Sequence, residues 1–135
     1  ASNATFHTPF TQLAINPEGC SSFTFPLLMG RQKANEMLIL GKKLDAQEAA
    51  ELRLVNKVFA SGEELEDGVT SIARTIAKFP QSSIGITKRM MREQGGVFES
   101  LKRVNKQESE ELKRRFMTRG ALQAAVRFML RKSKL

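Results

Sequence analysis

The sequence contains no tryptophan, no tyrosine, and only one cysteine and one histidine. A single cysteine, Cys20, cannot form a disulfide within the chain and fits a reducing compartment. One cysteine and one histidine also cannot supply the usual ligands of a zinc site, so we expect no metal. A Ser-His-Asp triad would depend on His7, and the sequence has no G-x-S-x-G turn to expose a serine. The composition therefore disfavours metal chemistry and serine hydrolysis.

Long hydrophobic runs are also lacking, since no segment reaches the roughly 20 apolar residues of a membrane-spanning helix. The charge balance is uneven, with 22 Lys and Arg against 14 Asp and Glu and a net charge of +8. Such an excess suits nucleic acid, a membrane surface or a polyanionic small molecule. No basic stretch carries the interleaved aromatic residues that stack on bases, so a phosphate-bearing ligand is favoured over nucleic acid.

The most informative stretch runs from Phe6 to Ser22, and its first charged residue is Glu18. Pro17 disfavours helical geometry in the residue before it, so a helix can begin only after the turn. We expect the Glu18 carboxylate to be held by free backbone amides at the helix start and to face an apolar cleft. Burial favours the protonated form and a helix N-terminus the ionised form, a balance that suits a general base. The alternative is that Glu18 only caps the helix.

The sequence predicts a mostly α-helical single domain with one or two short strands. Residues 4–10 form a strand with no visible partner, which indicates either a piece of a longer protein whose sheet lies upstream or a wrong assignment. The start of the chain without methionine favours the longer protein. A short helix after Glu18 is expected to break at Pro26, and residues 31–40 form a second helix. Its buried face is expected to comprise Ala34, Met37 and Leu38.

Later segments follow the same helical spacing. Asp45 to Glu48 has the spacing of a capping box, and residues 54–59 alternate as a second strand. Helices are predicted from Ser61 to Lys78, over 97–117 after a break at Gly95-Gly96, and over 120–131. The polar stretch 106–111 is expected to lie on the surface or meet a partner. The buried faces of the first and last of these helices should contain Leu65, Val69, Ile72, Ile76 and Phe79, and Leu122, Ala125, Val126 and Met129.

Four segments together resemble one known family. They are Phe6–Phe10, Asn16–Ser22, Ala34–Ala49 and Leu54–Phe59. All resemble the second half of the crotonase (enoyl-CoA hydratase/isomerase) superfamily, and the Pro-Glu-Gly-Cys-Ser-Ser block resembles its peroxisomal delta-3, delta-2-enoyl-CoA isomerases and their chromodomain-linked relatives. The resemblance covers essentially all 135 residues. It implies the C-terminal half of a crotonase-like α/β fold, a helical trimerisation region. Its parts are an active-site segment (1–30), middle helices (31–94), C-terminal helices (97–132) and a targeting tail (133–135).

The resemblance also implies a reaction. In the isomerases, the glutamate that matches Glu18 moves a proton between C2 and C4 of an acyl-CoA. Hydratases place a catalytic glutamate where this sequence has Phe10, and an apolar side chain cannot activate water. Phe10 is therefore expected to line the substrate site, and isomerisation is favoured over hydration. The oxyanion hole of the superfamily lies in the first half of the fold, so we expect residues 1–135 alone to be inactive.

The C-terminal end carries two further expectations. The resemblance implies that Phe128 and Arg131 contact the CoA adenine and phosphate, although Phe128 could equally be a core residue. Ser133-Lys134-Leu135 matches the peroxisomal targeting signal, which implies a peroxisomal import receptor as a partner and the peroxisome as the location. Coenzyme A enters as part of the substrate, and no other cofactor is expected.

Two alternatives to the isomerase remain open. One is a non-catalytic acyl-CoA-binding or oligomerisation module of the same fold, and the other is a basic helical nucleic-acid binder. The first would bind CoA without turnover. The second would lose affinity steeply with salt and would not bind CoA. For the isomerase, the family implies a homo-oligomer, expected to be a trimer.

Overall fold

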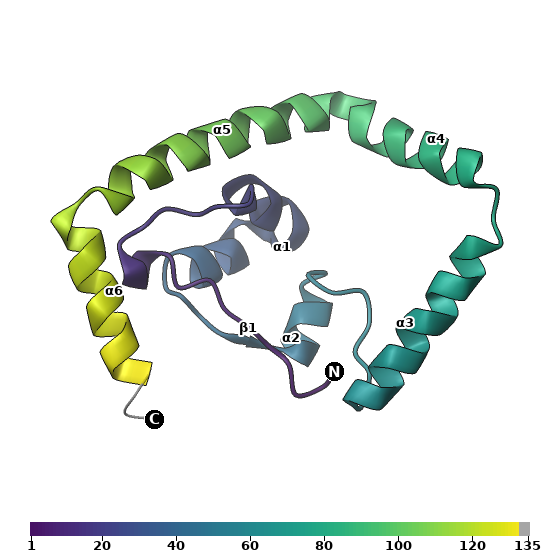
Figure 1. The fold of residues 1–135 in the computed structure, drawn as a ribbon, viewed down its shortest axis with the longest axis horizontal. Coiled ribbons are helices and arrows are strands. Elements are labelled where there is room, and N and C mark those ends of the chain that lie inside the picture. The colour runs from purple at the N-terminus through teal and green to yellow at the C-terminus, as the bar shows by residue number, and fades with distance from the viewer. Residues whose placement is uncertain (133–135) are drawn as a thin grey trace.

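A computed structural model describes residues 1–132, and the helices α3 to α6 follow one another along an open arc around the N-terminal third of the chain (Figure 1). Helix α5 packs on α1, and α6 packs on η1. The elements in order are β1 (Thr5–Phe6), η1 (Thr11–Leu13), α1 (Ser21–Leu38), β2 (Leu44–Asp45), α2 (Ala46–Glu51), α3 (Gly62–Ala77), α4 (Gln81–Glu93), η2 (Gln94–Gly96), α5 (Val97–Phe116) and α6 (Arg119–Lys132). The expectation of a mostly helical chain with one or two short strands is confirmed.

The two strands pair with each other inside the arc. β1 runs antiparallel to β2, with Thr5 opposite Asp45 and Phe6 opposite Leu44. The strand expected over residues 4–10 is therefore shorter than predicted, and it pairs with β2, a strand that was not predicted. Leu44 is 1% exposed, so this small sheet contributes directly to the core.

The prediction of a strand over residues 54–59 is wrong. These residues form turns and irregular backbone, although their apolar side chains are half-buried. The carbonyl of Phe59 accepts a hydrogen bond from the Ser2 amide at 2.7 Å, an isolated contact rather than a ladder. The Phe59 ring lies directly on Gly68 of α3, where a Cβ atom would collide with the ring. The alternation of apolar and polar residues in this segment therefore reflects partial burial of the apolar side chains and not strand pairing.

Helix α1 continues through Pro26, so the predicted break there is wrong. Pro26 cannot donate the hydrogen bond that an amide would give to the preceding turn, yet the helix persists on both sides of it. The change of direction comes instead at Gly30, with φ 75° and ψ 160°. Glycine adopts this conformation without the steric cost of a Cβ atom, which explains why the bend falls there.

The buried hydrophobic residues are few, and they come from α1, β2, α2, α6 and the residue before η1. The predicted face of Ala34, Met37 and Leu38 is confirmed, because all three side chains are buried. The remaining buried hydrophobic residues are Phe10, Leu44, Ala46, Ala49 and Ala121.

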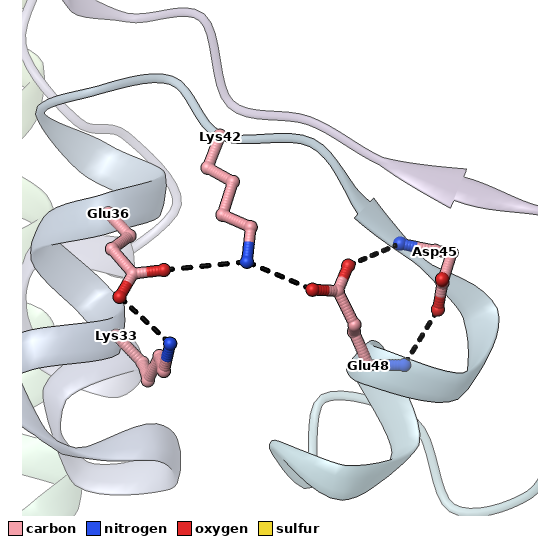
Figure 2. Close-up of polar contacts among 5 residues, drawn as sticks. All are labelled: Lys33, Glu36, Lys42, Asp45 and Glu48. Carbon is pink, nitrogen blue, oxygen red and sulfur yellow. Dashed lines mark hydrogen bonds and ion pairs between the residues drawn. The ribbon is translucent and has the colours of Figure 1, made fainter.

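The capping box at the start of α2 is confirmed, and it belongs to a larger polar network (Figure 2). The Asp45 carboxylate accepts from the Glu48 amide at 2.8 Å, and the Glu48 carboxylate accepts from the Asp45 amide at 3.1 Å. Lys42 lies between Glu48, at 2.9 Å, and Glu36 on α1, at 3.5 Å. Glu36 also pairs with Lys33 at 2.8 Å. The network ties the end of α1 to the start of α2.

These contacts shift three pKa values in the direction that stabilises charge. The hydrogen bond from Lys33 lowers the pKa of the Glu36 carboxyl, and the hydrogen bond from Lys42 lowers the pKa of Glu48. The hydrogen bond to Glu48 raises the pKa of Lys42. The side chains of Glu36, Lys42 and Glu48 are each about a third exposed, so each contribution is partly screened by solvent and salt.

The apolar stripe of α3 is largely exposed, contrary to the predicted buried face. Val69, Ile72, Ile76 and Phe79 are each about half exposed, and only Leu65 is half-buried. On α6, the expected core positions Leu122, Val126 and Met129 are also exposed, Ala125 is half-buried, and Ala121 is buried instead. These helices present amphipathic faces that no described residue of this chain covers.

The break at Gly95-Gly96 and the long helix after it are confirmed as η2 and α5. Among residues 1–132, no helix is both long and apolar enough to cross a membrane. The same residues contain no group of three or more His, Cys, Asp or Glu side chains placed to hold a metal ion.

Candidate functional site

Glu18 lies in the turn that leads into α1. Gly19 and Cys20 both adopt the left-handed conformation, each with φ 63°, and α1 begins at Ser21. The carbonyl of Glu18 accepts hydrogen bonds from the amide and the hydroxyl of Ser21, at 3.1 and 2.7 Å. A left-handed cysteine is unfavourable by itself, so the surrounding contacts must stabilise this turn.

A second glutamate, Glu108 of α5, supplies those contacts. Its buried carboxylate accepts from the Cys20 amide at 2.6 Å, from the Ser22 amide at 3.0 Å and from the Ser22 hydroxyl at 2.5 Å. The amides at the start of α1, which were expected to hold Glu18, are therefore bound by Glu108. Residues 106–111 were expected to be on the surface or against a partner, and at Glu108 the surface expectation is wrong because this side chain is buried.

Helix α5 also contacts the chain on the other side of Glu18. The side-chain amide of Asn16 donates to the Glu108 carbonyl at 3.0 Å and to the Pro17 carbonyl at 2.7 Å. The thiol of Cys20 donates to the Leu101 carbonyl at 3.4 Å. Residues before and after Glu18 are thus attached to the same helix, which fixes the backbone of the turn at both ends.

The Glu18 side chain itself is exposed and, within the described residues, makes no hydrogen bond or ion pair. It does not cap α1, because the carboxylate at that helix start belongs to Glu108. It is also not buried in an apolar cleft within this chain. The arrangement is a backbone hydrogen-bonded on both sides of an exposed carboxylate.

The sequence analysis missed Glu108, although a signal was present. Leu101, Val104 and Leu112 lie on the half-buried face of α5, and position 108 shares their helical spacing. A carboxylate on such a face is costly to bury unless it is hydrogen-bonded. The spacing could therefore have indicated a buried polar contact, but not the turn that provides it.

Phe10 is in the core, 9% exposed. Its carbonyl accepts from the amides of Leu13 and Ile15, at 3.1 and 3.0 Å, which organises η1. The role of Phe10 in lining the substrate site stays a prediction.

Phe128 of α6 stacks on His7, with ring centroids 6.5 Å apart and an interplanar angle of 27°. This contact brings the last helix against the N-terminal segment. The role of Phe128 at the CoA adenine stays a prediction. Arg131 is in the helical backbone of α6, but its side chain lies outside the described part, as do Ser133, Lys134 and Leu135.

Two hollows flank the turn. One, of about 260 Å³, is lined by Thr11, Ala14, Ile15, Asn16 and Arg115. The other, of about 460 Å³, follows α1 and is lined by Ser22, Phe23, Pro26, Leu27, Arg31 and Asn35. Each combines apolar side chains with one guanidinium group, a lining that suits a ligand with both alkyl and anionic parts.

Comparison with known proteins identifies the family. Residues 1–132 match the family Enoyl-CoA hydratase/isomerase. The chain is 43% identical over 132 residues to enoyl-CoA delta isomerase 2 of Rattus norvegicus, covering 98% of this chain and 33% of that protein. It is 38% identical over 131 residues to the peroxisomal enoyl-CoA delta isomerase 3 of Mus musculus, covering 97% of this chain and 40% of that protein.

A solved structure supports the same relationship. The fold matches Pseudomonas aeruginosa OdaA with a TM-score of 0.90 at 29% identity, over 96% of this chain and 51% of that chain. The chain therefore spans about a third of the length of the isomerase 2 relative and about half of the solved chain. The match confirms a partial crotonase-like fold. On the family match and the identity to these isomerases, the chain belongs to the enoyl-CoA hydratase/isomerase family, the crotonase superfamily.

Proposed function

We propose that the protein containing this chain is an isomerase that converts 3-enoyl-CoA to 2-enoyl-CoA in fatty-acid β-oxidation, with Glu18 as the proton shuttle. The observation that carries the proposal is the Glu18 carboxylate, which is exposed and unpaired within the described residues on a turn whose backbone is hydrogen-bonded at both ends. The identity to proteins named enoyl-CoA delta isomerase supports it.

The reaction needs one base acting twice. Glu18 removes a proton from C2, the electron pair of that C–H bond forms a double bond between C1 and C2, and the carbonyl π pair moves onto the thioester oxygen as an enolate. The same carboxyl then returns the proton to C4: the carbonyl re-forms, the C1–C2 pair moves between C2 and C3, and the former C3–C4 π pair forms the new C4–H bond. Two backbone amides must stabilise the enolate. The family resemblance places them in the first half of the fold, so we propose that residues 1–135 alone do not turn over.

Hydration is disfavoured for a chemical reason. Water addition needs a second group to activate the water, and the family position for it holds Phe10, which is buried and apolar. A phenyl ring neither accepts nor donates the required proton. Among the described residues this leaves Glu18 as the exposed carboxylate on the turn, and one such group is sufficient for moving a double bond.

Substrate, assembly and location complete the proposal. The two hollows beside the turn, each with an arginine, suit an acyl-CoA, and no further cofactor is needed. The exposed apolar stripes of α3 and α6 support a homo-oligomer, for which the family implies a trimer. Ser133-Lys134-Leu135 supports a peroxisomal location through an import receptor. A fluorescent fusion ending in these residues should colocalise with a peroxisomal marker, and one without them should stay diffuse.

The test uses the full-length protein with two substrates. A 3-enoyl-CoA should be converted to the 2-enoyl-CoA, while addition of water to a 2-enoyl-CoA should be at least about 100-fold slower, the smallest gain usual for a general base. Rapid hydration would contradict the isomerase assignment. Binding of the acyl-CoA without either reaction would instead identify a non-catalytic acyl-CoA-binding module.

A further inference from the structure

We infer that Glu108 is a positioning residue for Glu18: it binds the amides at the start of α1 and so prevents Glu18 from capping its own helix. The inference rests on the proposed function, because it assigns a second residue to the same reaction. It depends on the contacts that Glu108 makes on either side of Glu18.

The first step is the saturation of the helix start. The amides of Cys20 and Ser22 lie only two and four residues after Glu18 in the sequence, so its carboxylate could compete for them if they were free. Both amides donate to the Glu108 carboxylate, as does the Ser22 hydroxyl. With these donors occupied, neither the Cys20 amide nor the Ser22 amide is available to hold the Glu18 carboxylate back from a substrate.

The second step is electrostatic. The N-terminus of a helix carries a partial positive charge that attracts the nearest carboxylate. Glu108 brings a full negative charge to that end from α5, where it is 7% exposed and therefore weakly screened by solvent. It thereby removes the attraction that would otherwise draw Glu18 onto the helix.

The third step is that the contacts holding the turn on α5 do not all depend on the side chain of Glu108. The Asn16 amide donates to the main-chain carbonyl of residue 108, and the Cys20 thiol donates to the carbonyl of Leu101. Neither contact uses the side chain of residue 108, so a substitution there that keeps the helix leaves both partners in place. Removing the carboxylate should therefore free the α1 amides while leaving the turn attached to α5, so that the main consequence falls on Glu18.

The predicted effect is on kcat. When the carboxylate of Glu108 is removed, Glu18 can bind the freed amides, and each turnover must first break that contact. We expect Glu108→Ala to lower kcat by on the order of 100-fold, the scale for a misplaced catalytic group, with KM within about threefold of wild type. Glu108→Gln keeps the reach and one accepting oxygen, so its kcat should lie between those of Ala and wild type.

The experiment measures kcat and KM for a 3-enoyl-CoA with full-length wild type, Glu108→Ala, Glu108→Gln and the control Glu110→Ala, with rates scaled to the fraction of folded protein. Glu110 is on the same helix but exposed, and its ion pair with Lys106 is long at 3.9 Å. The control should match wild type. If Glu108→Ala fails to fold, the kcat of Glu108→Gln tests the inference instead, and it should lie below that of wild type.

Two failures can be distinguished. An inactive wild type would overturn the proposed function. An active wild type with folded Glu108 variants whose kcat stays within twofold would overturn the inference alone. A rise in KM with unchanged kcat would also overturn it, because it would assign Glu108 to substrate binding.

Discussion

The carboxylate of Glu108 and the main-chain amide of Cys20 lie 2.6 Å apart, although they are 88 positions apart in the sequence. This contact joins the longest helix of the chain, α5, to the turn that holds Glu18. A carboxylate with several donors forms short, charge-assisted hydrogen bonds, which are stronger than neutral ones. The geometry of the candidate site therefore depends on a helix far from it in sequence.

The hydroxyl of Ser22 should contribute to this contact measurably. Ser22→Ala removes its bond to Glu108 but leaves the two amide bonds in place. Because the acceptor is charged, we expect a loss of about 1.5 kcal/mol in the free energy of unfolding, the lower end for such bonds. Urea denaturation of the full-length protein tests this. Ser71→Ala, at an exposed position on α3, is the control, and its free energy of unfolding should stay close to that of wild type. Equal losses in the two variants would contradict the stabilising hydrogen bond between Ser22 and Glu108.

Met37 should be among the most sensitive core positions. Its side chain is 1% exposed on the buried face of α1. Met37→Ala removes buried atoms and leaves a cavity, so the free energy of unfolding should fall by about 2–5 kcal/mol. Met117→Ala, at a site that is 90% exposed, provides the same substitution without burial. Comparable urea midpoints for the two variants would show that the core is not where the structure places it.

The network around Lys42 predicts a pH dependence. The pKa values of Glu36 and Glu48 are lowered from 4.5 by their lysine partners, so their stabilising effect is present above about pH 4.5 and is lost as the pH falls through the folded values. The pKa of Lys42 is raised above 10.5, so its effect is lost only as the pH rises through the higher folded value.

Lys42→Met should make the stability of the protein less dependent on pH on the acid side. The measurement is the thermal midpoint of the full-length protein from about pH 3 to pH 7 at low salt, the range in which carboxyl groups titrate. High salt should reduce the difference from wild type, because the charged groups are still in partial contact with solvent. Lys43→Met is the control, since the exposed Lys43 side chain makes no ion pair among the described residues. A control that flattens the profile equally would contradict the role of Lys42.

The stripe of α3 should take part in assembly. Ile72 and Ile76 are each about half exposed and lie on one face of the helix, one turn apart. We expect Ile72→Glu with Ile76→Glu to lower the sedimentation coefficient of the full-length protein, because two carboxylates would have to be desolvated at the interface. Thr70→Glu, on the opposite face of α3, should leave it unchanged. A double variant that retains the wild-type coefficient would argue that α3 is not at a subunit interface.

Local patterns in the sequence were sufficient for some of these features. The spacing of Ala34, Met37 and Leu38 predicted their shared burial, and Asp45 with Glu48 predicted the capping box, because both depend on neighbours within one or two helical turns. The alternation of residues 54–59 was misleading, since half-burial produces the same pattern as strand pairing. Likewise, the break expected at Pro26 was wrong, because a proline biases the backbone toward a helix end without enforcing one, and the bend falls at Gly30.

The candidate site was predicted only in part. Glu18 and its turn follow from Pro17 and the residues around it. The role of Glu108 required knowledge of which helix packs against the turn, and its partners lie 86 to 92 positions away. The α3 and α6 faces were recognised as amphipathic, but helical periodicity does not say whether the covering surface belongs to the same chain.

The most direct test of the account is the kcat of full-length Glu18→Gln with a 3-enoyl-CoA. Glutamine keeps the size of the side chain but cannot shuttle a proton, and the exposed Glu18 carboxylate makes no structural bond among residues 1–132. We predict that kcat falls by about 10²–10⁴-fold, the usual contribution of a general base, while the thermal midpoint stays that of wild type. Glu66→Gln, at an exposed site on α3, should have no effect. A Glu18→Gln variant with a kcat close to wild type would contradict the central claim that Glu18 is the base.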